Sequence, residues 1–407
     1  MPELNWVGKK LAHIAPASLI TDSIIYPYGY DYPNNEYENR LILGDNLNIM
    51  AALLPEYEGR INLIYADPPF FTNRKFSARI GRGEDSRKPD EWQMAEGYHD
   101  DWNGLDSYLD FLYQRLALMY RLLAPNGTLY LHLDWHADAY ARLLLDELFG
   151  ADHVLNEIIW TYHGPSPIRR AFNRKHDTIL AYVKNDRYTF NVDSIREPYN
   201  PNTVKTFAAS RKAGFGKVPD LERGKVPEDW WYFPVIARLH NERTGYPTQK
   251  PVALLERIVL ASSNPGDIVA DFFCGSGTTC FVAAKHRRKF ISTDETFRAL
   301  HTTRVRLTDL QASFSLEHDS AFKPVMEPTP KAVKVELSGD SICLQTKLDL
   351  DYWEVDPSWD GRIFRSAAQA RRPVRSGEIP RELKIKVGGT VCIRLVTAKG
   401  EQFQLNV

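Results

Sequence analysis

Short apolar runs alternate with segments of helical periodicity over the first three quarters of the chain. Apolar runs occur at 40–43, 61–65, 128–133 and 267–270. Segments in which apolar residues recur every three to four positions follow or precede them, at 47–54, 105–123, 137–149 and 251–261. This alternation predicts an α/β fold with a mostly parallel sheet and helices on both faces. In such folds the functional groups gather at the carboxyl ends of the strands.

The pattern changes beyond residue 314. Residues 315–331 contain three prolines and no apolar periodicity, so they are predicted to be a linker. Short strand-like runs separated by turns follow at 333–337, 341–346, 383–387 and 391–395. We therefore predict a first domain over 1–314, a linker over 315–331 and a small all-β C-terminal domain over 332–407.

The composition is that of an ordinary globular protein. Of 407 residues, 43% are apolar and 25% are charged, and no stretch has the roughly 18 consecutive apolar residues of a membrane helix. The N-terminus lacks the basic start and apolar run of a secretory signal, and four scattered cysteines do not suggest a disulfide framework. We therefore expect a cytoplasmic protein that does not contact a membrane. Because the formal net charge is -1, binding to nucleic acid requires a local concentration of Lys and Arg.

A glycine-rich turn joins a strand to a helix at 267–279, where the sequence is DIVADFFCGSGTT. Without Cβ atoms, Gly275 and Gly277 let the backbone approach a ligand closely, and the amides of a helix N-terminus suit a carboxylate. Asp271 ends the strand and is placed to accept hydrogen bonds from an amino group. Asp294 ends the next strand, where an acid can accept ribose hydroxyls. A purely structural turn is the alternative.

A second feature, Asp67-Pro-Pro-Phe70, follows the apolar run 61–65. Two consecutive prolines fix the backbone and remove two donors, which suits a rigid strand exit. In that frame the Asp67 carboxylate can accept a hydrogen bond from an exocyclic amino group, and Phe70 can stack on a flipped base. The alternative is a turn with a capping Asp and a buried Phe. Residues 74–104, which are polar and charged, are predicted to form a long mobile loop beside this candidate site.

These motifs, in this order, resemble those of DNA amino-methyltransferases of the β arrangement, in which the catalytic motif precedes the cofactor motif. Residues 67–70 are similar to the family's DPPY/DPPF motif, and 271–279 to its FxGxG loop. Gly44-Asp45 and the segment 245–251 (GYPTQKP) are similar to two further family motifs. The resemblance covers about residues 40–310. It implies a Rossmann-like, seven-stranded sheet that binds S-adenosylmethionine, and DNA as the substrate.

The resemblance also implies a role for each matched residue. The catalytic residues are Asp67, Pro68, Pro69 and Phe70. Asp67 and the Pro68 carbonyl hold the target amino group so that its lone pair points at the methyl sulfonium, and Phe70 stacks on the extruded base. Catalysis then requires mainly positioning, because the sulfonium is already a strong electrophile. The cofactor-binding residues are Asp45, Thr248, Gln249, Lys250, Asp271, Phe273, Gly275, Ser276, Gly277, Thr278, Thr279 and Asp294.

Three positions bear on the details of that reaction. Members that methylate N4 of cytosine more often have Ser at the first catalytic position, so Asp67 favours N6 of adenine. Phe70 replaces the commoner Tyr, which keeps stacking and removes a hydroxyl. The run Ser-Thr-Asp294-Glu295 is more polar than usual for the family and leaves open which acid meets the ribose. We interpret the chain as a site-specific adenine-N6 DNA methyltransferase from a restriction-modification or defence context. A cytosine-N4 enzyme and a non-catalytic DNA-binding protein on the same fold are the alternatives.

Basic and aromatic residues are interleaved between positions 169 and 225, with thirteen basic residues against six acidic ones. The family has its target recognition region in the corresponding place, about 184–245. Such a segment suits phosphate contacts to double-stranded DNA, whereas the alternative is a solvated loop region. The residues expected to contact DNA are Arg169, Arg170, Arg174, Lys175, Lys205, Arg211 and Lys212. A homodimer and a separate restriction subunit are further partners that the resemblance suggests, and we expect no metal site.

Overall fold

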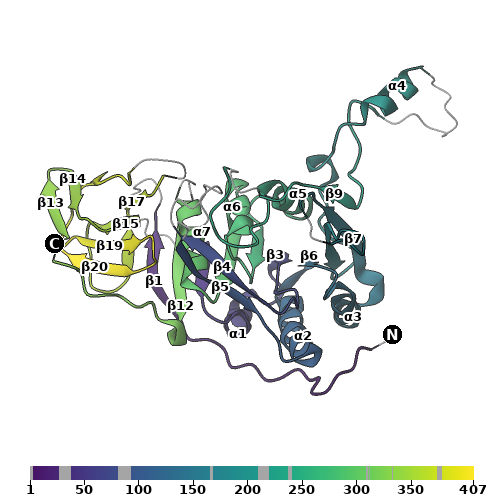
Figure 1. The fold of residues 1–407 in the computed structure, drawn as a ribbon, viewed down its shortest axis with the longest axis horizontal. Helices are drawn as coiled ribbons and strands as arrows, with labels where there is room; N and C mark the ends of the chain where they lie inside the picture. Colours follow the sequence, from purple (N-terminus) through teal and green to yellow (C-terminus); the bar gives the residue numbers. More distant parts are fainter. Residues whose placement is uncertain are drawn as a thin grey trace.

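An eleven-stranded sheet forms the centre of the molecule (Figure 1), in the order β16-β1-β12-β2-β11-β10-β3-β6-β8-β7-β9. The computed structural model describes residues 3–26, 38–80, 93–165, 168–209, 220–236, 241–308, 310, 312–331, 333–373 and 378–407. The strands of this sheet are β1 (Leu19–Ile25), β2 (Arg40–Leu43), β3 (Ile61–Ala66), β6 (Leu123–Leu133), β7 (Val154–Thr161), β8 (His176–Val183), β9 (Trp230–Tyr232), β10 (Ile268–Asp271), β11 (Lys289–Asp294), β12 (Phe314–Asp319) and β16 (Phe364–Ser366).

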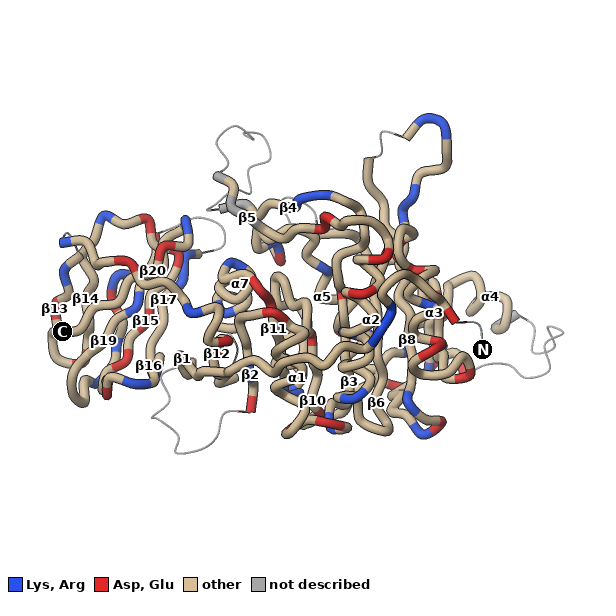
Figure 2. Tube along the Cα trace, turned by 90° about the horizontal axis from the view of Figure 1, so that it is seen from below, with Lys and Arg blue, Asp and Glu red and all other residues tan. Residues whose placement is uncertain are grey.

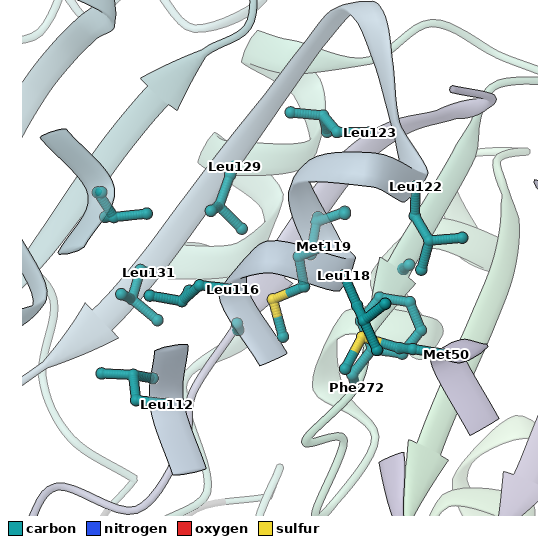
Figure 3. Packing of buried hydrophobic residues seen from close by; sticks show 14 of the residues in the cluster. Met50, Leu112, Leu116, Leu118, Met119, Leu122, Leu123, Leu129, Leu131 and Phe272 are labelled. Carbon is teal, nitrogen blue, oxygen red and sulfur yellow. The ribbon is translucent and has the colours of Figure 1, made fainter. Parts of the chain in front are cut away.

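Helices cover both faces of the sheet, as the apolar pattern predicts. They are α1 (Asn46–Tyr57), α2 (Leu105–Leu122), α3 (Asp138–Phe149), α4 (Pro201–Ala209), α5 (Val252–Ser262), α6 (Thr278–Lys285) and α7 (Phe297–Leu307). One core cluster joins α1, α2 and α3 to one face, and Figure 3 shows Leu112, Leu116 and Met119 of α2 beside Leu129 and Leu131 of β6. A second cluster joins α5, α6 and α7 to the other face. In Figure 1, α4 lies away from the sheet.

The central strands run in one direction, and this decides where the site lies. β2, β11, β10, β3 and β6 pair in parallel along the sheet. β8 is antiparallel to both β6 and β7, so β7 again runs with the central strands. The residues after β2, β3, β6, β7, β10 and β11 therefore share one edge of the sheet, which is where α/β folds bind ligands.

The C-terminal region is all-β, but its border with the rest differs from the expectation. Its sheets are β13-β14-β18 and β17-β15-β19-β20. Their strands are β13 (Lys334–Ser338), β14 (Ser341–Gln345), β15 (Leu350–Asp356), β17 (Ala368–Arg371), β18 (Glu382–Lys384), β19 (Cys392–Thr397) and β20 (Gln402–Asn406). The linker predicted at 315–331 is wrong at its start. Residues 314–319 form β12, which pairs between β1 and β2; sequence periodicity missed a strand whose alternate positions are Ser, Glu and Asp.

Two further expectations were wrong. The long mobile loop predicted at 74–104 contains instead a hairpin of β4 (Arg74–Ile80) and β5 (Gln93–Asp100), with residues 81–85 and their charges outside the described part. The sheet has more strands than the seven that the resemblance implies, because β1, β12 and β16 extend one edge and β9 the other. Figure 2 shows Lys and Arg mixed with Asp and Glu along the whole chain trace, in keeping with the near-zero net charge. Within the described residues, no helix has the length and apolar character required to cross a bilayer.

Candidate active site

A cavity of about 320 Å³ opens at the carboxyl edge of the sheet, where β2, β3, β10 and β11 end. The hairpin β4–β5 and the segment 246–250 complete its wall. All four residues of the motif 67–70 line it, and so do eleven of the twelve expected cofactor residues, the exception being Gly277. Its volume falls in the range of small-molecule sites. Motifs separated by two hundred residues are thus brought to one cavity.

Asp67, directly after β3, has one paired and one unpaired oxygen. Oδ2 accepts a hydrogen bond from the ammonium of Lys250, a side chain that is only 8% exposed. Oδ1 is buried and has no hydrogen-bond partner among the described residues. The Lys250 ammonium also lies 5.4 Å from the ring centroid of Phe70. A buried acceptor without a donor costs free energy, so Oδ1 is suited to accept an N–H from a ligand.

Phe70 rests on a buried polar network that sequence reasoning did not identify. Its ring stacks on His132 with the centroids 5.8 Å apart. The two ring nitrogens of His132 lie 2.7 Å from the Tyr65 hydroxyl and 3.1 Å from the Asp177 carboxylate. Burial opposes ionisation of Asp177, but the hydrogen bond and charge of His132 outweigh it, and the pKa of Asp177 is lowered. The network fixes the His132 ring, and with it the surface that supports Phe70.

Asp100, the last residue of β5, holds the backbone that leaves the catalytic motif. Its Oδ2 accepts hydrogen bonds from the Phe70 amide at 3.2 Å and from the Thr72 amide and hydroxyl at 2.8 and 2.6 Å. Its Oδ1 accepts from the Phe71 amide at 3.0 Å and from Trp102 Nε1 at 2.6 Å. Phe71 has a positive φ of 65°, a conformation that costs free energy for a residue with a Cβ. A carboxylate with five donors stabilises this turn, and with it the position of Phe70.

The carboxylate of Asp271, which we expected to be available for an amino group, is bonded to its own loop. Oδ2 accepts from the Thr279 hydroxyl at 2.5 Å, and Oδ1 from the Phe273 amide at 3.0 Å. Burial, together with the Asp67 and Asp294 carboxylates, raises the pKa of Asp271 to about 7. Asp271 therefore connects the end of β10 to the first turn of α6, while it still lines the cavity.

The two glycines of this loop are required by packing within the chain. Their φ angles are 49° for Gly275 and 72° for Gly277, in the left-handed region. A Cβ on Gly275 would lie 3.1 Å from Cε1 of Tyr246, and a Cβ on Gly277 would lie 2.5 Å from Cγ2 of Thr303. The expected reason, close approach to a ligand, is therefore joined at Gly275 and replaced at Gly277 by contact with a neighbouring side chain.

The acids after β11 differ in what they bind. Asp294 accepts hydrogen bonds from the Gly275 amide through Oδ2 and from the Thr296 amide and hydroxyl through Oδ1, each at 3.0 Å. Burial raises its pKa to about 6. Glu295 also lines the cavity, and burial together with the Asp45 carboxylate raises its pKa. Since Asp294 is engaged by the loop, Glu295 is the better placed of the two for ribose hydroxyls.

Arg115 of α2 is a cavity residue that sequence reasoning missed. It is 7% exposed, and burial lowers its pKa to about 10. Its guanidinium donates to Oδ1 of Asp45 at 3.0 Å and to Oδ1 of Asn46 at 2.7 Å, and it lies 3.7 Å from the centroid of the Phe111 ring. Asp45 meanwhile caps α1 through the amide of Leu47. Arg115 was hidden from the sequence because it occupies a position in an otherwise apolar helix pattern.

The hairpin and the segment 245–251 meet over the cavity. Tyr98 of β5 lies 3.4 Å from the hydroxyl of Thr248, which has a positive φ of 53°. A Cβ on Gly97 would lie 3.1 Å from Cγ of Pro247. The amide of Gln249 bonds within its own turn, to Thr244 and the carbonyl of Glu242. Thr248 is therefore available at the cavity wall, while Gln249 shapes the segment that carries it.

A loop with exposed basic and aromatic side chains lies beside the site. It joins the end of β7 to the start of β8, so it emerges at the same edge as Asp67. Arg169, Arg170 and Arg174 are exposed on it, and the Arg174 guanidinium lies 4.1 Å from the centroid of the Trp135 ring. Lys175 donates to the Pro165 carbonyl. Lys205 is exposed on α4, whereas Arg211 and Lys212 lie outside the described residues.

These features fit S-adenosylmethionine. The cavity has acids Asp45 and Glu295 at one end, the buried Oδ1 of Asp67 at the other, and the glycine turn before α6 between them. A ligand with ribose hydroxyls, a carboxylate and a cationic sulfur matches acceptors, helix amides and carboxylates in that order. The fold and site together define a class, the methyltransferases that act on exocyclic amino groups of DNA.

Comparison with known proteins gives the same class. The DNA methylase family, designated N6_N4_Mtase, matches residues 61–303. The type II methyltransferase M.HpaI of Haemophilus parainfluenzae is 32% identical over 248 residues, covering 61% of this chain and 68% of that protein. The DNA adenine methyltransferase YhdJ of Escherichia coli strain K12 is 32% identical over 253 residues, covering 62% and 76%. The solved structure of a DNA modification methylase from Thermus thermophilus, complexed with S-adenosyl-L-methionine, aligns with 70% of this chain and 100% of its own at 21% identity and a TM-score of 0.44.

The family match spans more than half of the chain, so the protein belongs to the DNA methylase family. It is an S-adenosylmethionine-dependent DNA methyltransferase. The predicted reaction class, cofactor and DNA substrate are thereby confirmed.

Proposed function

We propose that this methyltransferase modifies N6 of adenine within a short recognition sequence of double-stranded DNA. The observation that carries the proposal is Asp67, whose Oδ1 is buried without a partner among the described residues, beside the stacking ring of Phe70. Asp at this position favours adenine over cytosine. The name of the relative YhdJ, a DNA adenine methyltransferase, supports the same base.

The chain's own groups position the amino group for transfer. When bound, the cofactor supplies an electrophilic methyl group on a sulfonium. Asp67 Oδ1 accepts one N–H of the amino group, which turns the nitrogen lone pair out of conjugation and toward the methyl. Phe70, supported by His132 and by the turn that Asp100 holds, stacks on the flipped base. As positive charge develops on the amino nitrogen, the carboxylate of Asp67 stabilises it.

The Lys250 ammonium is also part of this machinery. It lies on Oδ2 of Asp67, so it neutralises a buried carboxylate before the base enters. The ammonium also fixes which oxygen remains free for the amino group. We therefore assign Lys250 to the catalytic carboxylate, in addition to its place in the wall of the cofactor cavity.

The isosteric variant Asp67→Asn tests the assignment. Asn offers an amide N–H₂ or a weaker neutral acceptor in place of the carboxylate, so methyl transfer to DNA should fall at least about 100-fold, as when one preorganised polar group is removed from an active site. Binding of S-adenosylhomocysteine, measured by calorimetry, should change little, because the cofactor end of the cavity is untouched. If the variant loses that binding and transfer together, Asp67 belongs to the cofactor site and the proposed role is wrong.

The target base is tested on DNA modified by the purified protein. Nucleoside mass spectrometry should find N6-methyladenine, and sequencing should place it at one short motif. N4-methylcytosine would replace the adenine proposal with its alternative, and unmodified DNA would favour a non-catalytic DNA-binding protein on the same fold.

We also propose how the enzyme contacts DNA and with what it works. Arg169, Arg170, Arg174, Lys175, Lys205, Arg211 and Lys212 would contact phosphates, and the exposed loop after β7 supports this for the first three. The relatives M.HpaI and M.BglII are named type II methyltransferases, which supports a restriction-modification context with a separate restriction subunit, in the cytoplasm. A homodimer is proposed on the family resemblance, and light scattering of the purified protein would measure its mass.

A further inference from the structure

Helix α7 packs one of its faces against the glycine loop of the cofactor cavity. The Thr303 hydroxyl donates to the Gly275 carbonyl at 3.3 Å, and its side chain fills the space that a Cβ on Gly277 would need. Arg306, one turn further along, donates from Nη1 to the Ser276 carbonyl at 3.0 Å and to the Thr278 hydroxyl at 2.8 Å. Three side chains and carbonyls of the loop are thus held from one helix.

The adjacent face of α7 is bound to the C-terminal β domain. Arg304 donates from Nη1 to Oε1 of Glu354 on β15 at 3.2 Å, and its guanidinium lies 4.4 Å from the centroid of the Tyr352 ring. Arg304 is 6% exposed and Glu354 is fully buried. The Tyr352 hydroxyl donates to the other Glu354 oxygen at 3.0 Å. Because removal of one partner would leave the other charge buried and uncompensated, this contact fixes the helix strongly.

His301 extends the contact with a defined direction. Arg304 Nη2 lies 3.0 Å from Nδ1 of His301, and Nε2 of the same ring lies 2.8 Å from the Asp351 carboxylate. An arginine can only donate, so Nδ1 accepts and Nε2–H donates to Asp351. Burial lowers the pKa of His301 to about 4, which keeps the ring neutral and this arrangement intact at neutral pH.

We infer that the C-terminal β domain positions the cofactor loop through α7. His301 and Arg304 anchor the helix to β15, while Thr303 and Arg306, on the same two turns, hold residues 275–278. Figure 1 shows α7 between the C-terminal sheets and α6. Glu354 lies beyond the span of the family match, which ends at 303. Glu354 is thus a positioning residue for the cofactor, although it does not line the cavity.

The inference depends on the assignment of this cavity to S-adenosylmethionine, and a matched pair of variants tests it. Glu354→Gln breaks the charge pair on α7. Asp22→Asn breaks a comparable pair, between β1 and Arg394 of β19, that also joins the two regions but does not involve α7. The probe is S-adenosylhomocysteine, and its Kd is measured by calorimetry on the full-length protein. We expect Glu354→Gln to raise this Kd by about fivefold to tenfold, a usual size of coupling between sites, while Asp22→Asn leaves it within about twofold.

Thermal melts and a double-mutant cycle separate positioning from general loss of stability. Both variants should lower the melting temperature, but only Glu354→Gln should change the Kd. Arg306→Met removes the direct contact to the loop, and adding Glu354→Gln to it should raise the Kd much less than the two single effects predict. Equal effects of Glu354→Gln and Asp22→Asn on the Kd, or strictly additive effects in the cycle, would overturn the inference.

Two further measurements keep the outcomes distinct. If Glu354→Gln does not fold, Arg304→Lys, which keeps the charge and loses the second donor to His301, takes its place and should raise the Kd in the same direction. At saturating cofactor, the single-turnover rate of Glu354→Gln should stay within about threefold of wild type, so that the KM for cofactor changes more than kcat. Failure of the wild-type protein to bind S-adenosylhomocysteine would refute the cofactor assignment itself.

Discussion

Asp100→Asn gives a strong test of how the catalytic turn is held. The carboxylate accepts hydrogen bonds from three donors on Oδ2 and two on Oδ1. In either orientation the Asn side chain places an N–H₂ group against one of these sets. The smaller set, the Phe71 amide and Trp102 Nε1, is therefore the least that can be lost.

The expected size of the effect follows from that count. Hydrogen bonds to a charged acceptor contribute at least about 1.5 kcal/mol each, so two of them amount to about 3 kcal/mol. If this loss falls entirely on the transition state, it corresponds to about 100-fold in rate, at about 1.4 kcal/mol for each factor of ten. Part of it will instead lower the stability of the folded protein. We therefore expect a decrease of about tenfold to 100-fold in the rate of methyl transfer.

The assay is a single-turnover transfer to DNA at saturating cofactor, which isolates the chemical step from product release. Asp101→Asn is the matched control, because it makes the same change at an exposed neighbour, and its rate should equal that of wild type. Folding of both variants is checked by thermal melts. A folded Asp100→Asn protein with a rate within about twofold of wild type would show that the turn does not depend on this carboxylate.

Two further predictions concern pH and DNA. Because the folded-state pKa of Asp271 is raised to about 7, above the usual value near 4 of the unfolded chain, the folded protein holds an extra proton between these values, and the contribution of Asp271 to stability decreases as the pH rises through this window. Asp271→Asn should therefore become more stable relative to wild type from pH 5 to pH 8, and melting curves with a constant difference across that range would contradict the buried, protonated carboxyl. Replacing both Arg169 and Arg170 by Ala should weaken DNA binding and reduce its dependence on salt by about one ion for each lost phosphate contact, whereas Arg121→Ala, before the opposite end of β6, should change neither; an unchanged salt slope in the double variant would remove these two arginines from the interface.

The sequence alone determined the reaction class, because the residues that carry it are local. Asp67-Pro-Pro-Phe70 and the turn containing Gly275 are contiguous motifs, each next to a strand whose apolar run is visible in the sequence. Parallel strands place their ends at one edge whatever the loops between them do. The predicted site residues could therefore be assigned before any coordinates, apart from the reasons for Gly277 and Gln249, which depend on their neighbours.

Tertiary structure decided everything that depends on pairing between distant segments. Asp100 lies in a stretch that the sequence marks only as polar, and its function appears when β5 returns to the catalytic turn. Arg115 and β12 were missed because their polar residues interrupt the apolar period, although each polar group finds a partner far away in the chain, as Arg40 and Glu317 do. Hydrophobic periodicity records which face of an element is buried, but not which element covers it. The link from Glu354 through α7 to the cofactor loop is such a relation between elements, and only the folded chain defines it.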